Sequence, residues 1–286
     1  MKRKSGIIFY FLFFVFYFNA GVVLAEENSQ PQQAPSLRRQ AIEYASKGEF
    51  SQAKTKFQQA AEEDKSDNTS RSSLALLDDL GKNKIKNDYA IEFFKAFNNL
   101  NNGKTEEAIS GFQNAISLEP SYVSTYNVLG MVYASSGGLD GAVNNFQKAI
   151  SLDPGYALAY FNLGSIYQAQ DKLEKAIEFY AKAIQLNHKL PECYLNLGII
   201  YASLNRYPEA IASYKKAIEL EPQNPAAYYN MGLAYFMSGE YLNSRQNLLK
   251  AKELFSQQGN SEGVSNVEKY MSKFTALEQK WQESSK

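Results

Sequence analysis

Apolar and small residues recur along this chain with a period of 34 residues. In the window that begins at Val123, four of them lie at i, i+3, i+4 and i+7, which is the spacing of one helix face. They are Tyr126, Leu129, Gly130 and Tyr133. A second set at i, i+4 and i+7 predicts a second helix and consists of Ala142, Phe146 and Ala149.

The same order of residues returns three times, each time 34 positions later. The glycine of the pattern recurs as Gly130, Gly164, Gly198 and Gly232. Short polar or Gly-containing stretches between the two sets predict a turn. Pro154 and Pro222 follow the second set in their copies and end the helix, because Pro has no N–H to continue it. Each copy is therefore a predicted helical hairpin, whose apolar face is buried only when neighbouring hairpins stack.

This order of aromatic, Leu-Gly, aromatic, Ala, aromatic, Ala and Pro resembles the tetratricopeptide repeat (TPR). The resemblance implies an all-α fold, a right-handed superhelical solenoid of helix–turn–helix repeats. The predicted regular repeats span residues 89–122, 123–156, 157–190, 191–224 and 225–258. A degenerate first repeat is predicted at residues 37–67, where the pattern is weaker.

The period breaks between the first two repeats. Residues 68–88 form an insert that contains several leucines and predicts an additional helix, capped by Ser or Thr, across the joint. Residues 26–36, which are rich in Gln, Pro and Ser, predict a flexible leader.

A final helix is predicted at residues 261–283. Its apolar residues form one stripe on a polar helix, namely Val264, Val267, Met271, Phe274, Leu277 and Trp281. Terminal repeats need a cap with one polar face, so this segment is interpreted as a C-terminal capping helix. The alternative is a helix that docks into a partner.

Residues 1–25 have a different composition. Lys2, Arg3 and Lys4 precede an apolar run, and Val23 and Ala25 fit the small-residue rule for signal-peptidase cleavage. This predicts a signal peptide. The alternative is an uncleaved anchor, since residues 7–25 are 19 residues long and could span a bilayer. Both interpretations predict an extracytoplasmic protein, either periplasmic or secreted.

The net charge and the numbers of Cys and His residues argue against several classes of function. The chain has 30 basic and 30 acidic side chains, and three of the basic ones lie in residues 1–25, so the mature chain carries a net charge of −3. This argues against a nucleic-acid partner. The single Cys, Cys193, permits no intrachain disulfide, and the single His, His188, has no metal-ligand companions at useful spacing. No nucleophile motif or phosphate-binding loop is present, so no enzyme, cofactor or metal site is predicted.

The TPR resemblance implies that the first helix of each repeat lines a concave groove. Transferred position by position, it predicts a peptide-binding set of Asn127, Met131, Phe161, Asn162, Leu195, Asn196, Ile199, Tyr229, Asn230, Leu233 and Phe236. These positions contain no Lys or Arg, which argues against a carboxylate ligand. An apolar or mixed extended peptide, or a partner helix, is expected instead.

Asn162, Asn196 and Asn230 recur at one position of successive repeats. A side-chain amide both donates and accepts hydrogen bonds, so such a ladder could hold the backbone of an extended peptide. The arrangement is similar to the Asn ladder in the superhelix of the O-linked N-acetylglucosamine transferases. Alternatively, the amides stabilise the repeats internally, and the C-terminal helix or a second copy of the chain covers the apolar positions.

The expected function is a non-catalytic scaffold for protein–protein contacts outside the cytoplasm, in an envelope assembly or secretion complex. Two alternatives stay open. One is a structural subunit that self-associates as a homo-oligomer. The other is an accessory subunit of an enzyme complex, anchored to the membrane by an uncleaved N-terminal segment.

Overall fold

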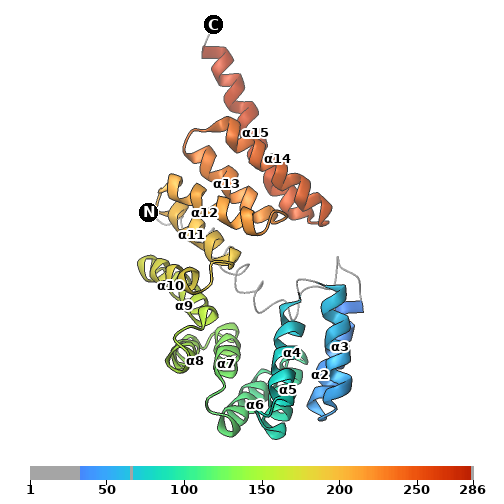
Figure 1. Cartoon of the computed structure of the whole chain (residues 1–286). Coiled ribbons are helices and arrows are strands. Elements are labelled where there is room, and N and C mark those ends of the chain that lie inside the picture. Colours follow the sequence, from blue (N-terminus) through green and yellow to red (C-terminus); the bar gives the residue numbers. More distant parts are fainter. Residues whose placement is uncertain (1–32, 65–66, 285–286) are drawn as a thin grey trace. The chain divides into compact units, whose positions relative to one another are not determined.

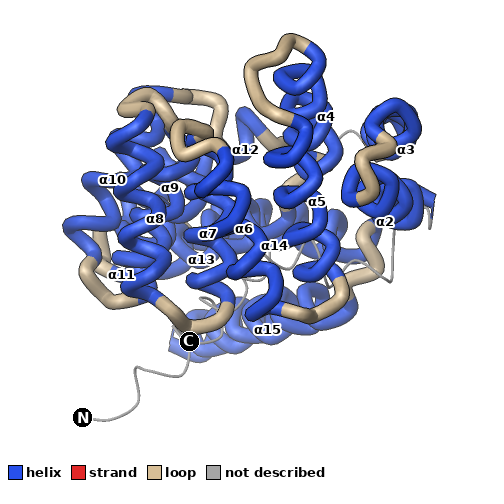
Figure 2. The backbone as a smooth tube through the Cα atoms, turned by 90° about the horizontal axis from the view of Figure 1, so that it is seen from below, coloured by secondary structure: helices blue, strands red, loops and turns tan. Residues whose placement is uncertain are grey.

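The computed structural model describes residues 33–64 and 67–284, without the side chains of residue 273 and residues 275–284. In these residues it contains fourteen helices and no strand (Figures 1 and 2). None of the described helices is apolar enough over a sufficient length to cross a bilayer. The predicted signal segment, residues 1–25, lies outside the described residues.

The chain divides into two compact units, residues 1–162 and 163–286, with the boundary inside helix α9 (Ala157–Ala169). Before α9, the first unit contains α2 (Gln33–Ser46), α3 (Phe50–Glu63), α4 (Asn68–Gly81), α5 (Asn87–Asn101), α6 (Thr105–Leu118), α7 (Val123–Ser135) and α8 (Leu139–Leu152). After α9, the second unit contains α10 (Leu173–Leu186), α11 (Pro191–Ser203), α12 (Tyr207–Leu220), α13 (Pro225–Met237), α14 (Tyr241–Gln257) and α15 (Ser261–Ser284).

The turn inside each hairpin contains a left-handed residue, which is the fifteenth residue of each regular repeat. In chain order these turn residues are Gly48, Gly103, Gly137, Asp171, Asn205 and Gly239. The next residue donates its N–H to a carbonyl five residues earlier, for example Lys172 to Tyr167 at 2.9 Å. This satisfies a carbonyl at the end of the first helix and reverses the chain. Gly, Asn and Asp are the residues that adopt this conformation at least cost.

In the last four regular repeats, a glycine in the first helix meets a large side chain of the second helix. A Cβ built on Gly164 would lie 2.8 Å from the Tyr180 ring, and one on Gly130 would lie 2.6 Å from Phe146. The ring of Tyr180 is fully buried and flanked by Ala176 and Ala183, which are also buried. The contact explains the Leu-Gly pair, because only glycine lets the two helices approach this closely.

The first hairpin begins earlier than predicted. Helix α2 starts at Gln33, inside the segment interpreted as a flexible leader to Ser36, and Ala34 is buried. Leu37, where the degenerate repeat was predicted to begin, lies in the second turn of α2. The Gln and Ser residues at this end remain on the exposed side of the helix, which is why composition alone suggested a leader.

The insert forms one helix, α4, which packs mainly against α3. Its cap is Asp67, whose carboxylate accepts the backbone N–H of Ser70 at 2.9 Å, rather than the Ser or Thr that the sequence suggested. Asp67 is buried and also pairs with Arg38 of α2 at 3.1 Å. Near the other end of α4, Tyr122 donates to Asp79 at 3.1 Å, which connects the insert to the start of α7.

One additional helix reverses the direction of the first hairpin. Helix α2 packs against α5, and Gly48, just after α2, lies next to Ile91 near the start of α5. The two helices therefore run antiparallel, whereas the first helices of consecutive regular repeats run in the same direction. Phe93 and Phe94 of α5 and Phe57 of α3 fill the joint, with the rings of Phe57 and Phe94 5.9 Å apart.

Helix α15 lies against α14 at the end of the second unit (Figure 1). Val267 and Phe274 are buried, Val264 and Met271 are half-buried, and most of the remaining described side chains are exposed and polar. Leu277 and Trp281 belong to the side chains that the structure does not describe. In the described part, the helix has one apolar face and one polar face, as expected for a cap.

The contact between Gly164 and Tyr180 generates a stability prediction. Replacing Gly164 with Ala places a methyl group against a buried ring, so the free energy of unfolding should fall by about 1–3 kcal/mol. The control is Gly81→Ala, at the end of α4, where no atom lies within 4 Å of a new Cβ. That change should be neutral or stabilise the chain by less than about 1 kcal/mol. Urea unfolding followed by circular dichroism measures both, and equal effects would contradict the packing argument.

Candidate partner-binding face

The predicted peptide-binding residues all lie on first helices of the repeats, but several are buried. Asn127, Asn196, Asn230 and Phe161 are between 2% and 6% exposed. The others are half-buried, namely Met131, Asn162, Leu195, Ile199, Tyr229, Leu233 and Phe236. The sequence pattern placed these residues on the correct helices, and the degree of burial depends on the neighbouring repeat.

In the first unit, two of the asparagines bond to each other. Asn162 donates from Nδ2 to Oδ1 of Asn127 at 2.8 Å, which joins α9 to α7. The Nδ2 of Asn127 lies 3.7 Å from Sδ of Met131. Phe146 is the aromatic residue of the preceding repeat at the position that corresponds to this joint. It has no hydroxyl, so the amide of Asn127 supplies the acceptor instead.

In the second unit, Asn196 belongs to a buried network around Tyr180. Asn196 donates to the Tyr180 hydroxyl at 3.0 Å, and that hydroxyl donates to Oε1 of Gln168 at 2.7 Å, with Oγ of Ser165 3.1 Å away. Burial raises the pKa of Tyr180 above its usual value, so the hydroxyl stays protonated. The amide of Asn196 thus connects one repeat to the next.

Asn230 differs from its equivalents. Its side chain is 6% exposed, and Nδ2 has no hydrogen-bond partner. By register, its neighbour is Tyr214, but Ile199 and Ala202 stand where the network around Tyr180 has Ser165 and Gln168. The polar network is therefore absent at this joint, and Asn230 is a buried donor without an acceptor.

The apolar members of the predicted set pack on the following helix. Leu195 and Ile199 of α11 contact the cluster that contains Met231 and Tyr235 of α13. In the last repeat, the corresponding face of α13 consists of Tyr229, Leu233 and Phe236, which pack in the cluster that contains Val267 and Phe274 of α15. The C-terminal helix therefore packs on the predicted positions of the last repeat, and not on Leu195 and Ile199.

Two large apolar side chains of the first helices remain open to solvent. Leu158, at the second position of its repeat, is 43% exposed, and Met237, at the thirteenth position, is 62% exposed. Both occupy positions that line the groove in the TPR resemblance. Leu158 lies at the start of α9 and Met237 at the end of α13, and the period alone does not reveal that these two side chains are exposed.

Two neighbouring residues at the start of α11 have raised pKa values. Glu192, at the start of α11, is half-buried, and burial raises the pKa of its carboxyl. Cys193 is fully buried, and burial raises the pKa of its thiol, which disfavours the reactive thiolate. No group of three His, Cys, Asp or Glu side chains that could hold a metal ion occurs among the described residues.

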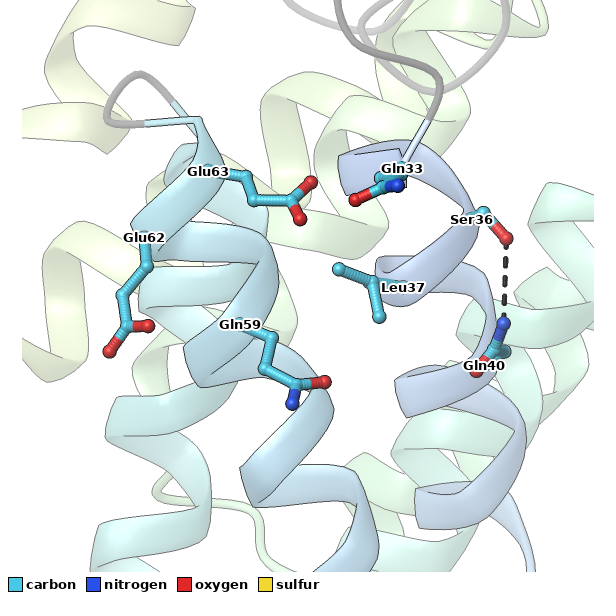
Figure 3. A pocket seen from close by; sticks show the side chains of 7 residues that line it. All are labelled: Gln33, Ser36, Leu37, Gln40, Gln59, Glu62 and Glu63. Carbon is cyan, nitrogen blue, oxygen red and sulfur yellow. Dashed lines mark hydrogen bonds between the residues drawn. The ribbon is translucent and has the colours of Figure 1, made fainter.

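A polar depression lies between the start of α2 and the end of α3. It has a volume of about 740 Å³ and is lined by Gln33, Ser36, Leu37, Gln40, Gln59, Glu62 and Glu63 (Figure 3). All but Leu37 are exposed and polar. The depression is on α2 and α3, away from the first helices of the regular repeats, and contributes nothing to the predicted peptide-binding set.

Comparison with known proteins identifies the repeats. The TPR repeat family model matches residues 130–171 and 200–239, and the tetratricopeptide repeat model matches residues 157–190. The repeats are therefore tetratricopeptide repeats. A search of curated proteins gives no match to this chain.

Solved structures share the fold. A crystal structure of MamA is 29% identical, with 57% of this chain and 96% of that chain covered and a TM-score of 0.53. MamA from Desulfovibrio magneticus RS-1 is 18% identical, with 61% and 98% covered and a TM-score of 0.55. Pseudomonas aeruginosa pilF is 19% identical, with 70% and 98% covered and a TM-score of 0.52. The chain is a TPR solenoid, a class of scaffold that binds proteins and is generally non-catalytic.

The different partners of Asn196 and Asn230 generate the second prediction. Asn196→Ala removes a bond to the buried Tyr180 hydroxyl and should lower the free energy of unfolding by about 1–3 kcal/mol. Asn230→Ala leaves a cavity of the same kind but removes an amide whose Nδ2 has no partner. Its loss should be smaller by about 1 kcal/mol. Chemical unfolding of both variants measures the difference, and equal losses would refute an internal role for Asn196.

Proposed function

We propose that this chain is a scaffold that acts outside the cytoplasm and binds a partner protein through the first helices of its repeats. The observation that carries this proposal is the exposure of Leu158 and Met237 at groove positions. Large apolar side chains left in solvent at such positions mark interaction sites. The eleven residues predicted from the sequence would then support the binding face, and those that are half-buried would add to the contact.

The N-terminal segment is compatible with a role in an envelope assembly or secretion complex. Three basic residues, an apolar run and small residues at positions 23 and 25 favour export. A periplasmic or secreted scaffold would meet its partner there. MamA and pilF are similar in fold, and at these identities the similarity indicates the architecture of the chain and not its partner.

A second candidate is self-association as a structural subunit. Leu242 and Leu249 of α14 are 72% and 48% exposed and lie two helical turns apart on one face. The equivalent positions of the preceding repeat are Pro208 and Lys215, so this apolar pair is a feature of the last repeat. Two copies could pair through this face in antiparallel orientation, with each Leu242 against a Leu249.

Site-specific photocrosslinking in cells separates these functions. A photoreactive phenylalanine at Leu158 or Met237 should capture a different protein, whereas one at Gln147, an exposed residue of the second helix α8, should not. The same probe at Leu242 reports on the second candidate, because it would yield a dimer of this chain. Crosslinks of equal yield from Gln147 and Leu158 would exclude the proposed binding face.

The mass of the mature chain tests export. We expect cleavage after Ala25, so that intact mass spectrometry of the purified protein finds Glu26 as the first residue. Retention of residues 1–25 together with fractionation into membranes would favour the anchored accessory subunit instead. If residues 1–25 are retained and the protein does not associate with membranes, both the signal peptide and the membrane anchor are contradicted.

A further inference from the structure

Helix α15 occupies a face that belongs to the proposed binding surface. The rings of Tyr229 and Tyr270 are 6.1 Å apart, and those of Phe236 and Phe274 are 5.1 Å apart in an edge-on arrangement. Leu233 packs into the same cluster. Tyr229, Leu233 and Phe236 are the fifth, ninth and twelfth residues of the last repeat, and the TPR resemblance assigns these positions to the groove.

The contact shows what kind of ligand this face accepts. Val267, Tyr270, Met271 and Phe274 lie at i, i+3, i+4 and i+7 of α15 and form its inner stripe. The opposite side carries polar residues such as Lys269 and Ser272, which are exposed. An amphipathic helix laid by its apolar face onto aromatic residues is a recurring mode of partner recognition.

The attachment of α15 is weak compared with that of the repeats. Among its described side chains, Val267 and Phe274 are the fully buried apolar ones, whereas α13 buries Ala227, Met231, Ala234 and Tyr235. The ion pair between Lys252 and Glu268 is exposed on both sides and contributes little. Elements at the end of a stacked array have neighbours on one side only and open first.

Asn230 on the same helix is a buried donor without an acceptor. Its side chain is 6% exposed, and Nδ2 has no partner. Such a donor destabilises the arrangement that contains it. By register its neighbour is Tyr214 of α12, so this cost belongs to the joint between α12 and α13 and not to the contact with α15.

We propose that α15 is a detachable occupant of the α13 face, and that the partner is an amphipathic helix that replaces it. This inference rests on the proposed function and specifies its ligand. The helix carries apolar residues at i, i+3, i+4 and i+7. An extended peptide fits less well, because the amides of Asn162 and Asn196, which would hold its backbone, bond within the chain.

The test uses the full chain and a fluorescent synthetic peptide of residues 261–284 as the probe. Phe274→Ala in the chain weakens the resident helix, so anisotropy should show the peptide binding at least about tenfold more tightly than to the unmodified chain. Adding Phe236→Ala to that variant should abolish binding. Lys269→Ala, on the exposed side of α15, is the matched control and should leave affinity unchanged.

Hydrogen exchange of the unmodified chain provides a second measurement. The amides of α15 should exchange at least about tenfold faster than those of α13, because the helix opens by itself. Exchange of α15 and α13 at one common rate would overturn the proposal, as would a folded Phe274→Ala chain that does not bind the peptide. Crosslinks from Leu158 would be unaffected by either result, so failure of this inference is distinguishable from failure of the proposed function.

Discussion

The close contact between a glycine of one helix and a large side chain of the next is the interaction on which the last four regular hairpins depend. Gly164 against Tyr180 is the clearest example, because the ring is fully buried and a Cβ on Gly164 would lie only 2.8 Å from it. The contact sets the distance between the two helices. The left-handed turn residue, Asp171 in this repeat, then needs only to connect helices that are already at that distance.

The same ring also determines what the face of the array can do. Because Tyr180 carries a hydroxyl, it accepts a hydrogen bond from Asn196 of the following repeat. The amide of Asn196 is then engaged inside the chain rather than with a ligand. Where the ring is Phe146, Asn162 turns to Asn127 instead. Where the polar companions are replaced by Ile199 and Ala202, Asn230 is left without an acceptor for Nδ2. The residue at one buried position of a repeat thus determines which hydrogen bonds the Asn of the next repeat makes.

The hairpins could be predicted from the sequence because the 34-residue period repeats the same contact four times. The hydrogen-bond partners of the asparagines could not be predicted. A side-chain amide can bond equally well to a ligand or to a neighbouring hydroxyl, and only the three-dimensional arrangement decides between them. The packing of α15 on Tyr229 and Phe236 was one of several alternatives. The apolar stripe predicted on residues 261–283 does not reveal which surface it packs against. The start of α2 was hidden by a polar composition that also suits an exposed helix face.

The antiparallel pairing of α2 with α5 has a consequence for how the array can grow. A standard repeat is added by stacking a first helix in the same direction as the one before it. The single helix α4 gives the first hairpin the opposite direction. A hairpin stacked on it in the standard manner would run in the same direction as α2 and opposite to the regular repeats. One extra helix between two hairpins is thus enough to divide an array into segments of opposite direction.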